Sequence, residues 1–270
     1  MTGDLQKTIL ITGASRGIGL ATATLLAGRG FTVYGTSRQP QAETRNSFTL
    51  LPLDVRDEQS VNTCVETVIS RSGRLDVLIN NAGYTLSGAV EEATVADAYR
   101  LFETNFFGVM RLTNAVLPHM RRAGRGHIIN ISSLAGLIGV PYLGLYAASK
   151  HALEGYSASL RYELYASNIH ISLVEPGDIH TSIASEPPSN LLAAYDGVRE
   201  RVAAVHAHNL KHGPPPEKVA RVILKAIEQP EPRLRYTVAG GDETLLPWAR
   251  RLLSNGLLEY FIRRAYGLTG

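Results

Sequence analysis

Short, nearly continuous apolar runs recur along the chain and alternate with longer stretches whose apolar positions have helical spacing. Runs of this kind are typical of strands that are buried on both faces of a parallel sheet. Regular alternation of strands and helices predicts an α/β fold with one doubly wound, mostly parallel sheet and helices on both faces. The expected strands are residues 7–12, 31–36, 47–53, 75–80, 126–131, 169–175 and 234–239, and the expected helices are residues 17–28, 57–72, 94–122, 146–166 and 217–228.

Two regions depart from this alternation. Residues 179–216 form a long segment that ends in three consecutive prolines, and such an insertion is typical either of a substrate loop or of a variable surface connection. Residues 242–270, called the tail below, have apolar positions at helical spacing with arginines between them, which predicts a helical C-terminal extension. No internal repeat divides the chain, so residues 1–270 are expected to form a single domain.

The composition is that of an ordinary globular protein, with 44% hydrophobic and 19% charged residues. A chain of 270 residues can bury a core without disulfides or metal ions. Cys64 is the only cysteine, which excludes an intrachain disulfide and suits a reducing compartment. We expect no secretory leader, because the apolar residues 9–11 near the start indicate a first strand. We expect no membrane-spanning helix, because no apolar run approaches ~20 residues. These features predict a cytoplasmic protein.

The net charge of +3 arises in the C-terminal part of the chain. Residues 211–270 hold 10 Lys and Arg against 6 Asp and Glu, whereas the first 210 residues are nearly neutral. A nucleic-acid partner is not expected, because no basic stripe with interleaved aromatic side chains accompanies this excess.

The first expected strand runs directly into a glycine-rich turn at residues 13–19, Gly-Ala-Ser-Arg-Gly-Ile-Gly. Glycines permit a tight turn and a close approach of the backbone, and the helix that follows offers its N-terminal amides to a pyrophosphate. Many turns use glycine for conformational reasons alone, but this position at the first strand–helix junction predicts a dinucleotide site. The expected contacts are Gly13, Ser15, Arg16, Gly17, Ile18 and Gly19.

The end of the second expected strand indicates which dinucleotide binds. NAD-binding folds place an acid there to hold the ribose 2′-hydroxyl, but this strand ends in Ser37 and Arg38. Arg38 and Arg16 can reach a 2′-phosphate, and Ser37 can add a hydrogen bond. The alternative is that both arginines are solvated surface residues. The missing acid favours NADP(H) over NAD(H).

Two further strand ends supply expected contacts. Asp54 and Val55 follow the third strand, where we expect them to contact adenine, although an isolated Asp can equally cap a loop. The fourth strand ends in Asn-Asn-Ala-Gly at residues 80–83, and ligands gather at this edge of an open parallel sheet. Asn81, Ala82 and Gly83 are therefore expected to lie beside the dinucleotide.

A tyrosine, a lysine and a serine predict the chemical step. Tyr146 and Lys150 are four residues apart, so they share one face of a helix. A neighbouring cation, together with positive charge on nicotinamide, stabilises the phenolate of a tyrosine whose pKa is otherwise ~10. Ser133, thirteen residues before Tyr146, can hold a substrate oxygen, and Ser132 competes for this role. Tyr146 and Lys150 alone could be a chance surface pair, but beside the glycine turn they predict general acid–base catalysis.

On these motifs the chain resembles the short-chain dehydrogenase/reductase superfamily, whose members have a Rossmann-type fold. The resemblance covers residues 7 to about 181 and rests on the glycine turn, residues 80–83, Asn105, Ser133, Tyr146-Ala-Ala-Ser-Lys150 and residues 176–181. It implies hydride transfer between nicotinamide and a carbonyl or secondary alcohol, with Tyr146 as the acid/base.

The resemblance also implies roles for individual residues. Ser133, Tyr146 and Lys150 form the implied catalytic core, with Ser133 favoured over Ser132 by its spacing from Tyr146. Asn105 is the implied fourth member and supports a water-linked proton relay to Lys150. The implied nicotinamide contacts are Tyr146, Lys150, Pro176, Gly177, Ile179 and Thr181, of which the backbone near Ile179 and the Thr181 hydroxyl receive the carboxamide.

Two branches of the superfamily compete. Ketoacyl-carrier-protein reductases usually end soon after their last strand, whereas this chain continues to residue 270. The tail and residues 31–38 resemble the hydroxysteroid and retinol dehydrogenase-like branch, which implies a bulky apolar alcohol or ketone. The alternatives are a ketoacyl reductase and a non-catalytic, NADP(H)-responsive binding protein, although the latter would be expected to lack one of Ser133, Tyr146 and Lys150.

The apolar face of the tail is expected to pack on the domain or on another subunit, and the alternative occupant is an anionic membrane surface. The expected partner is a small carbonyl or alcohol substrate, with no metal ion. Relatives commonly pair helices such as residues 94–122 and 146–166 between subunits, so the resemblance implies a homo-dimer or homo-tetramer.

Overall fold

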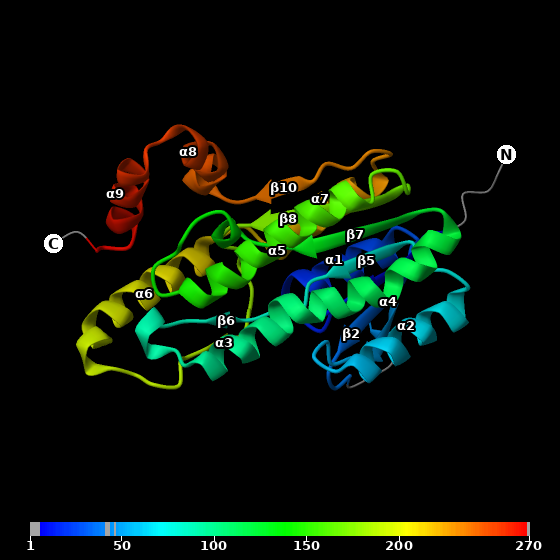
Figure 1. Ribbon diagram of the computed structural model, residues 1–270, viewed down its shortest axis with the longest axis horizontal. Coiled ribbons are helices and arrows are strands. Elements are labelled where there is room, and N and C mark those ends of the chain that lie inside the picture. The colour runs from blue at the N-terminus through cyan, green and yellow to red at the C-terminus, as the bar shows by residue number, and fades with distance from the viewer. Residues whose placement is uncertain (1–5, 41–43, 46, 269–270) are drawn as a thin grey trace.

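A computed structural model describes residues 6–40, 44–45 and 47–268 of the chain. Within them, an eight-stranded sheet has the order β10-β8-β7-β5-β1-β2-β4-β3 (Figure 1). Seven of these strands run parallel, and β3 pairs with β4 in the antiparallel direction at one edge. The predicted doubly wound, Rossmann-type fold class is confirmed. The strands are β1 (Thr8–Ile11), β2 (Thr32–Ser37), β3 (Thr44–Arg45), β4 (Phe48–Pro52), β5 (Val77–Asn80), β7 (Gly126–Ile131), β8 (Ile169–Pro176) and β10 (Arg235–Val238).

Helices cover both faces of the sheet because successive strand residues point to opposite sides. In β1, Ile9 and Ile11 pack into the core on the side of α1 and α7, whereas Leu10 packs into the core on the side of α2, α4 and α5. All three side chains are fully buried. The covering helices are α1 (Gly17–Gly28), α2 (Glu58–Ser72), α4 (Gly108–Ala123), α5 (Gly144–Glu163) and α7 (Pro216–Glu228).

The strand expected at residues 47–53 begins one residue later, at Phe48. Ser47 has a φ of 70°, a left-handed conformation that a strand does not contain. The chain reverses there, so that β3 pairs with β4 in the antiparallel direction. The hydrophobic pattern does not predict β3, because this edge strand has only two residues.

The prediction of a single helix over residues 94–122 is wrong, because the structure divides this stretch into three parts. Helix α3 (Val95–Phe102) leads into a π-helical turn (Glu103–Phe107), which leads into α4. The turn contains Asn105, whose side chain bonds to the backbone of Tyr84 on another segment. A wider turn inside a helix is often found at a functional site.

The segment at residues 179–216 is largely helical and not an open loop. It contains β9 (Ser185–Glu186), a 3₁₀ turn (Ala193–Tyr195) and α6 (Asp196–His212). Within α6 only Val202 is buried, so the sequence lacks the apolar stripe that would predict a helix. Strand β9 pairs in parallel with β6 (Thr85–Leu86), which places the segment beside the carboxyl ends of the central strands.

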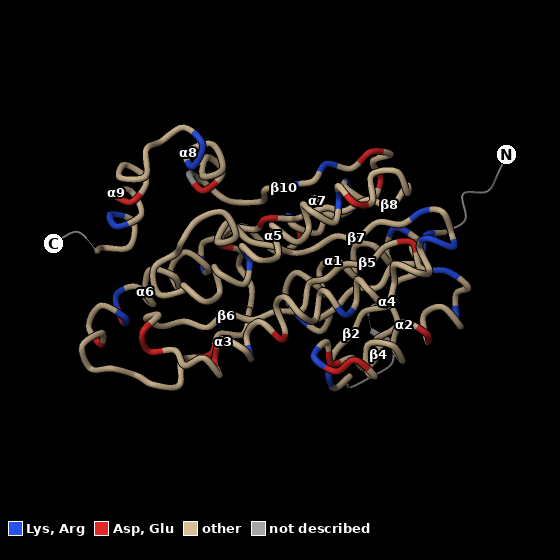
Figure 2. The backbone as a smooth tube through the Cα atoms, in the orientation of Figure 1, with Lys and Arg blue, Asp and Glu red and all other residues tan. Residues whose placement is uncertain are grey.

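The tail forms the predicted helical extension. A 3₁₀ turn (Gly241–Leu245) leads into α8 (Leu246–Leu252), and Ser254 caps the first turn of α9 (Asn255–Ala265). The two helices lie at one end of the molecule and carry several basic residues (Figures 1 and 2). Thr269 and Gly270 lie outside the described residues. Over the part of the chain that the structure describes, no helix is both long and apolar enough to cross a membrane.

Candidate active site

A cleft of about 730 Å³ opens at the carboxyl ends of the parallel strands. Strands β2 and β5 flank β1 on opposite sides, and this reversal of strand order is where open α/β sheets bind ligands. The lining contains every residue that the sequence singled out for cofactor or catalysis, apart from Gly19 and Asn105. The sequence therefore brings distant motifs to one cleft.

The glycine turn has the shape needed for a close backbone approach. Gly13 and Gly17 have φ of 67° and 56°, in the left-handed region that favours glycine. Gly19 does not line the cleft but packs behind it, since a Cβ at Gly19 would lie 2.3 Å from the Gly13 carbonyl oxygen and 2.6 Å from Asn81 Nδ2. Helix α1 begins at Gly17, and Gly17 and Ile18 both line the cleft, so the N-terminus of the helix lies at the cleft, an arrangement that fits a pyrophosphate.

Thr12 fastens the glycine turn to the loop after β5. Its Oγ1 accepts hydrogen bonds from the amides of Asn81 at 2.8 Å and Ala82 at 2.9 Å. Asn81 Nδ2 in return donates to the carbonyl oxygens of Thr12 at 2.8 Å and Gly13 at 3.1 Å. Asn81 thus holds the turn in place besides lining the cleft. The sequence interpretation missed Thr12, although its position between β1 and the turn is a usable signal.

At the adenosine end, Ser37 and Arg38 line the cleft and no carboxylate ends β2. The carboxylate of Asp54 accepts hydrogen bonds from Arg56 Nε at 2.9 Å and Nη2 at 2.6 Å. The Arg56 hydrogen bonds, aided by the charges of Arg56 and Arg38, lower the pKa of Asp54 although burial opposes the shift. Asp54 is therefore held by Arg56, a cleft residue that the sequence interpretation missed.

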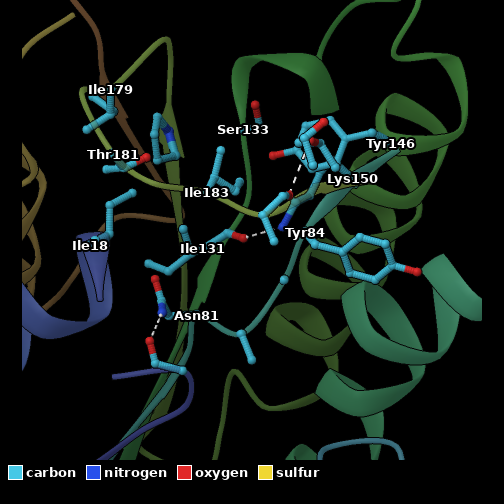
Figure 3. A pocket seen from close by; sticks show the side chains of 18 of the residues that line it. Ile18, Asn81, Tyr84, Ile131, Ser133, Tyr146, Lys150, Ile179, Thr181 and Ile183 are labelled. Carbon is cyan, nitrogen blue, oxygen red and sulfur yellow. Dashed lines mark hydrogen bonds between the residues drawn. The ribbon is translucent and has the colours of Figure 1, made fainter. Parts of the chain in front are cut away.

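Ser133, Tyr146 and Lys150 come together at the opposite end of the cleft (Figure 3). Ser133 follows β7, and its hydroxyl is near enough to the phenol of Tyr146, in the first turn of α5, to lower the pKa of that phenol. Lys150 lies one turn further along, with Nζ 5.7 Å from the centre of the Tyr146 ring. Its Nζ donates to the Ile131 carbonyl oxygen at 2.8 Å. Both serines line the cleft, but Ser132 is buried beside Gly136, and Ser133 is the one whose hydroxyl affects the pKa of Tyr146.

Burial is the main cause of the shifted pKa values of Tyr146 and Lys150. It raises the pKa of Tyr146 to about 12, against a lowering effect of the Ser133 hydrogen bond. Burial also lowers the pKa of Lys150 to about 8, although the charge of Glu154 opposes that shift. The Lys150 charge was expected to lower the pKa of Tyr146, but this lowering is not found in the protein without cofactor. The cost of burying a phenolate is larger than the stabilisation that the Lys150 charge provides. The phenol is neutral at physiological pH.

Asn105 lies behind the cleft and is only 1% exposed. Its Nδ2 donates to the Tyr84 carbonyl at 3.0 Å and to Ser149 Oγ at 3.3 Å, and its Oδ1 accepts from the Tyr84 amide. It therefore joins the π-helical turn both to Tyr84, in the loop just before β6, and to the helix of Lys150. A water-linked relay from Asn105 to Lys150 stays a prediction.

Besides the expected cofactor residues, the lining of the cleft includes many apolar side chains, together with charged ones such as Arg100, Glu186 and Glu243. The segment at residues 179–216 and the tail both contribute to it, and the His206 ring packs on the Tyr266 ring with 4.9 Å between centroids. These positions carry no motif, so the sequence does not predict them individually. The apolar lining comprises Leu134, Ile138, Val140, Leu143, Ile183, Leu210, Leu246 and Tyr266.

Two buried carboxylates fasten the segment at residues 179–216 over this end of the cleft. Glu92 accepts from the Leu192 amide at 2.9 Å and pairs with Arg199. Asp97 accepts from Ser189 Oγ at 2.6 Å. Burial opposes ionisation of Asp97, but hydrogen bonds from Ser189 and Thr94 hold its pKa well below the usual range. The segment is therefore anchored in the position in which it walls the cleft.

Curated relatives match nearly the whole chain. A 3-ketodihydrosphingosine reductase of Bacteroides thetaiotaomicron is 40% identical over 96% of this chain and 98% of its own length. Bovine retinol dehydrogenase 8 is 38% identical over 86% of this chain and 81% of its own length. Human 17-beta-hydroxysteroid dehydrogenase type 1 is 35% identical over 93% and 82%, respectively. These neighbours confirm the resemblance to the hydroxysteroid and retinol dehydrogenase-like branch.

Solved structures agree with this assignment. A short-chain dehydrogenase of Streptomyces avermitilis has a TM-score of 0.84 and 32% identity, over 98% of this chain and 99% of that one. ElxO with NADP bound has a TM-score of 0.69 and 32% identity, over 82% of this chain and 91% of that one. The short chain dehydrogenase family model matches residues 7–191. This protein therefore belongs to the short-chain dehydrogenase/reductase family of oxidoreductases.

Proposed function

We propose that the protein is an NADP(H)-dependent oxidoreductase that interconverts a bulky apolar ketone or aldehyde and its alcohol, with Tyr146 as the acid/base. The observation that carries the proposal is that Ser133, Tyr146 and Lys150 line one cleft, with Lys150 Nζ 5.7 Å from the centre of the Tyr146 ring. This group stands between a glycine turn that fits a dinucleotide and an apolar end that fits a substrate.

When bound, the nicotinamide supplies the hydride for reduction and accepts it for oxidation. In the reductive direction, Ser133 Oγ and Tyr146 Oη hold the carbonyl oxygen, and Tyr146 donates its proton as negative charge develops there. The raised pKa of Tyr146, about 12, keeps the phenol in the form that donates. The Lys150 ammonium, held by the Ile131 carbonyl, stabilises negative charge on the phenol after the transfer. Oxidation uses the same atoms in reverse, and Tyr146 then accepts the alcohol proton.

NADP(H) is proposed as the cofactor because Arg16, Ser37 and Arg38 line the adenosine end, where NAD-binding folds place an acid. Arg38→Asp is expected to weaken NADPH binding by about 10- to 100-fold, consistent with ~1.5–3 kcal/mol for hydrogen bonds to a charged group. NADH binding should change little, and titration calorimetry with both cofactors measures the difference. Arg29→Asp is the control, because Arg29 is an exposed arginine outside the cleft. An equal loss for NADPH and NADH would reject the 2′-phosphate site.

A bulky apolar substrate is proposed because Leu143, Ile183, Leu246 and Tyr266 line the cleft beyond Tyr146. Relatives named for sphingoid and retinoid substrates support the same class. A screen with NADPH of apolar ketones, retinoid aldehydes and carrier-bound ketoacyl groups tests the proposal. Turnover confined to the carrier-bound groups would favour a ketoacyl reductase. NADPH binding without turnover of any carbonyl would favour a binding protein.

The shifted pKa values of Tyr146 and Lys150 predict that kcat/KM depends on pH differently for reduction and for oxidation. Reduction requires Tyr146 and Lys150 protonated, and with pKa values of about 12 and about 8 both are protonated at neutral pH. We expect kcat/KM for reduction to be level near neutral pH and to decline above pH 8. Oxidation requires the rarer phenolate, so its kcat/KM should rise through the neutral range. Initial rates in both directions measure this, and a reduction rate that falls steadily through neutral pH would contradict it.

We propose one catalytic domain in which residues 179–216 and the tail shape the substrate end. We also propose a cytoplasmic homo-dimer or homo-tetramer paired through α4 and α5. The exposed side chains of Val95 and Tyr99 on α3 and of Tyr162 on α5 support pairing in this region, because they leave apolar surface uncovered.

A further inference from the structure

The two tail helices leave large apolar side chains in water. Neither α8 nor α9 has a buried residue. Trp248 is 63% exposed, Leu252 78% and Phe261 51%. Leu257 and Tyr260 are also exposed. Trp248 and Leu252 are four residues apart on α8, and Leu257 and Phe261 are four apart on α9, so each helix exposes an apolar face. Monomeric proteins rarely expose large continuous apolar patches, and those that do usually bind a partner or a membrane there. The expected packing of the tail on its own domain is thus only partial.

The charges beside this patch are nearly all positive. Arg250 and Arg251 end α8, and Arg263 and Arg264 end α9, and all four are exposed (Figure 2). Glu259 is the single acid in the two helices, and Arg263 already pairs with it at 2.9 Å. The surface that covers the patch must therefore accept positive charge.

A bilayer with anionic lipids matches this surface better than a second copy of the chain does. A second copy of α8 and α9 would bring the same four arginines, and within these two helices the only acid is Glu259, which Arg263 already pairs with. Amphipathic helices that combine Trp, Phe and Leu with arginines bind in the interfacial plane of a membrane, where aromatic side chains are favoured. We propose that α8 and α9 bind the surface of an anionic lipid bilayer through Trp248, Leu252 and Phe261.

The same helices also form part of the substrate end of the cleft. Leu246, at the start of α8, and Tyr266, which follows α9, line the cleft together with Leu210 of α6. A membrane-bound tail thus places the apolar end of the cleft next to the lipid phase. This second part of the inference rests on the proposed function: an apolar carbonyl reaches Tyr146 from the bilayer along the tail.

Flotation of the full chain, without cofactor or substrate, tests membrane binding. The chain is mixed with vesicles of phosphatidylcholine alone or of phosphatidylcholine with phosphatidylglycerol, at low and high salt. We expect flotation with phosphatidylglycerol at low salt and much less with phosphatidylcholine alone or at high salt, because the basic residues are attracted to anionic lipid. A chain that stays unbound with every vesicle overturns the proposal.

Two paired variants locate the binding surface. Trp248→Ser with Phe261→Ser, and separately Arg250→Glu with Arg264→Glu, should each lower the partition into phosphatidylglycerol vesicles at least about tenfold. The controls are Tyr165→Ser, at a side chain that is 88% exposed on another surface, and Arg121→Glu with Arg122→Glu at the end of α4. Controls that lose binding as strongly as the tail variants overturn the proposal.

Light scattering and activity separate the remaining outcomes. If Trp248→Ser with Phe261→Ser lowers the molar mass in solution, the tail binds a second copy and the membrane proposal is wrong. For the substrate route, phosphatidylglycerol vesicles should raise kcat/KM for a long-chain apolar ketone, but not for a small water-soluble ketone or in the tail variants. Flotation without turnover of any ketone or aldehyde would reject the proposed function while leaving membrane binding intact. Turnover that is the same with and without vesicles would reject only the substrate route.

Discussion

Tyr146→Phe is expected to lower kcat for carbonyl reduction by about 10²- to 10⁴-fold, the usual contribution of general acid–base catalysis. The substitution removes only the phenolic oxygen, which is the atom that donates the proton. The ring packs in a small apolar cluster with Leu86, Leu101 and Ala147, and phenylalanine preserves that packing. NADPH affinity and thermal stability should therefore change little.

Steady-state kinetics with NADPH and the best ketone from the screen measure the loss, and calorimetry measures cofactor binding. Tyr156→Phe is the matched control, because Tyr156 is a partly buried tyrosine on the same helix and does not line the cleft. Activity close to wild type in Tyr146→Phe would remove Tyr146 from the mechanism. A parallel loss in both variants would mean that α5 had been disturbed.

Gly19→Ala is expected to cause the second large effect, on cofactor binding and on stability together. The added Cβ would lie 2.3 Å from the Gly13 carbonyl oxygen and 2.6 Å from Asn81 Nδ2, so the glycine turn or α1 must move. Overpacking of this kind costs roughly 1–3 kcal/mol. The displaced backbone forms the expected pyrophosphate site. We therefore expect dinucleotide affinity to fall about 10- to 100-fold, which corresponds to a loss of binding free energy within the same range of roughly 1–3 kcal/mol.

Gly28→Ala controls for the helical preference of alanine over glycine. Gly28 belongs to the same helix, and a Cβ there would meet no atom within 4 Å. Alanine is intrinsically better in a helix by ~1 kcal/mol, so Gly28→Ala should keep or raise the melting temperature and bind NADPH normally. Calorimetry and thermal unfolding compare the two variants. Equal behaviour would show that the turn tolerates a side chain at residue 19 and that the cradle is not closely packed.

The elements that the sequence predicted correctly are those whose signal is local. The parallel strands have apolar runs, and helices such as α2 begin at a capping residue, Asp57, and end at Gly73. The division of the helix at residues 94–122 could not be predicted, because it depends on hydrogen bonds between Asn105 and Tyr84, far apart in sequence. Helix α6 was missed because it buries only Val202.

The same distinction applies to the candidate site. The glycine turn and the spacing of Tyr146 and Lys150 are local patterns, so their residues could be named in advance. Other contacts depend on the folded arrangement: Thr12 hydrogen-bonds to the loop after β5, and Arg56 hydrogen-bonds to Asp54. The pKa of Tyr146 also depends on tertiary burial, which raises it and which the spacing of two residues does not reveal.

Trp248 is the only tryptophan in the chain and lies on the exposed surface of α8. Tryptophan fluorescence of this protein therefore originates outside the sheet and its covering helices, and its emission follows the surroundings of the tail. Far-ultraviolet circular dichroism follows the remainder of the fold. Denaturation midpoints from the two signals will coincide only if the tail and the sheet unfold as one cooperative unit. The natural chain thus carries an optical label on one segment and none in its core.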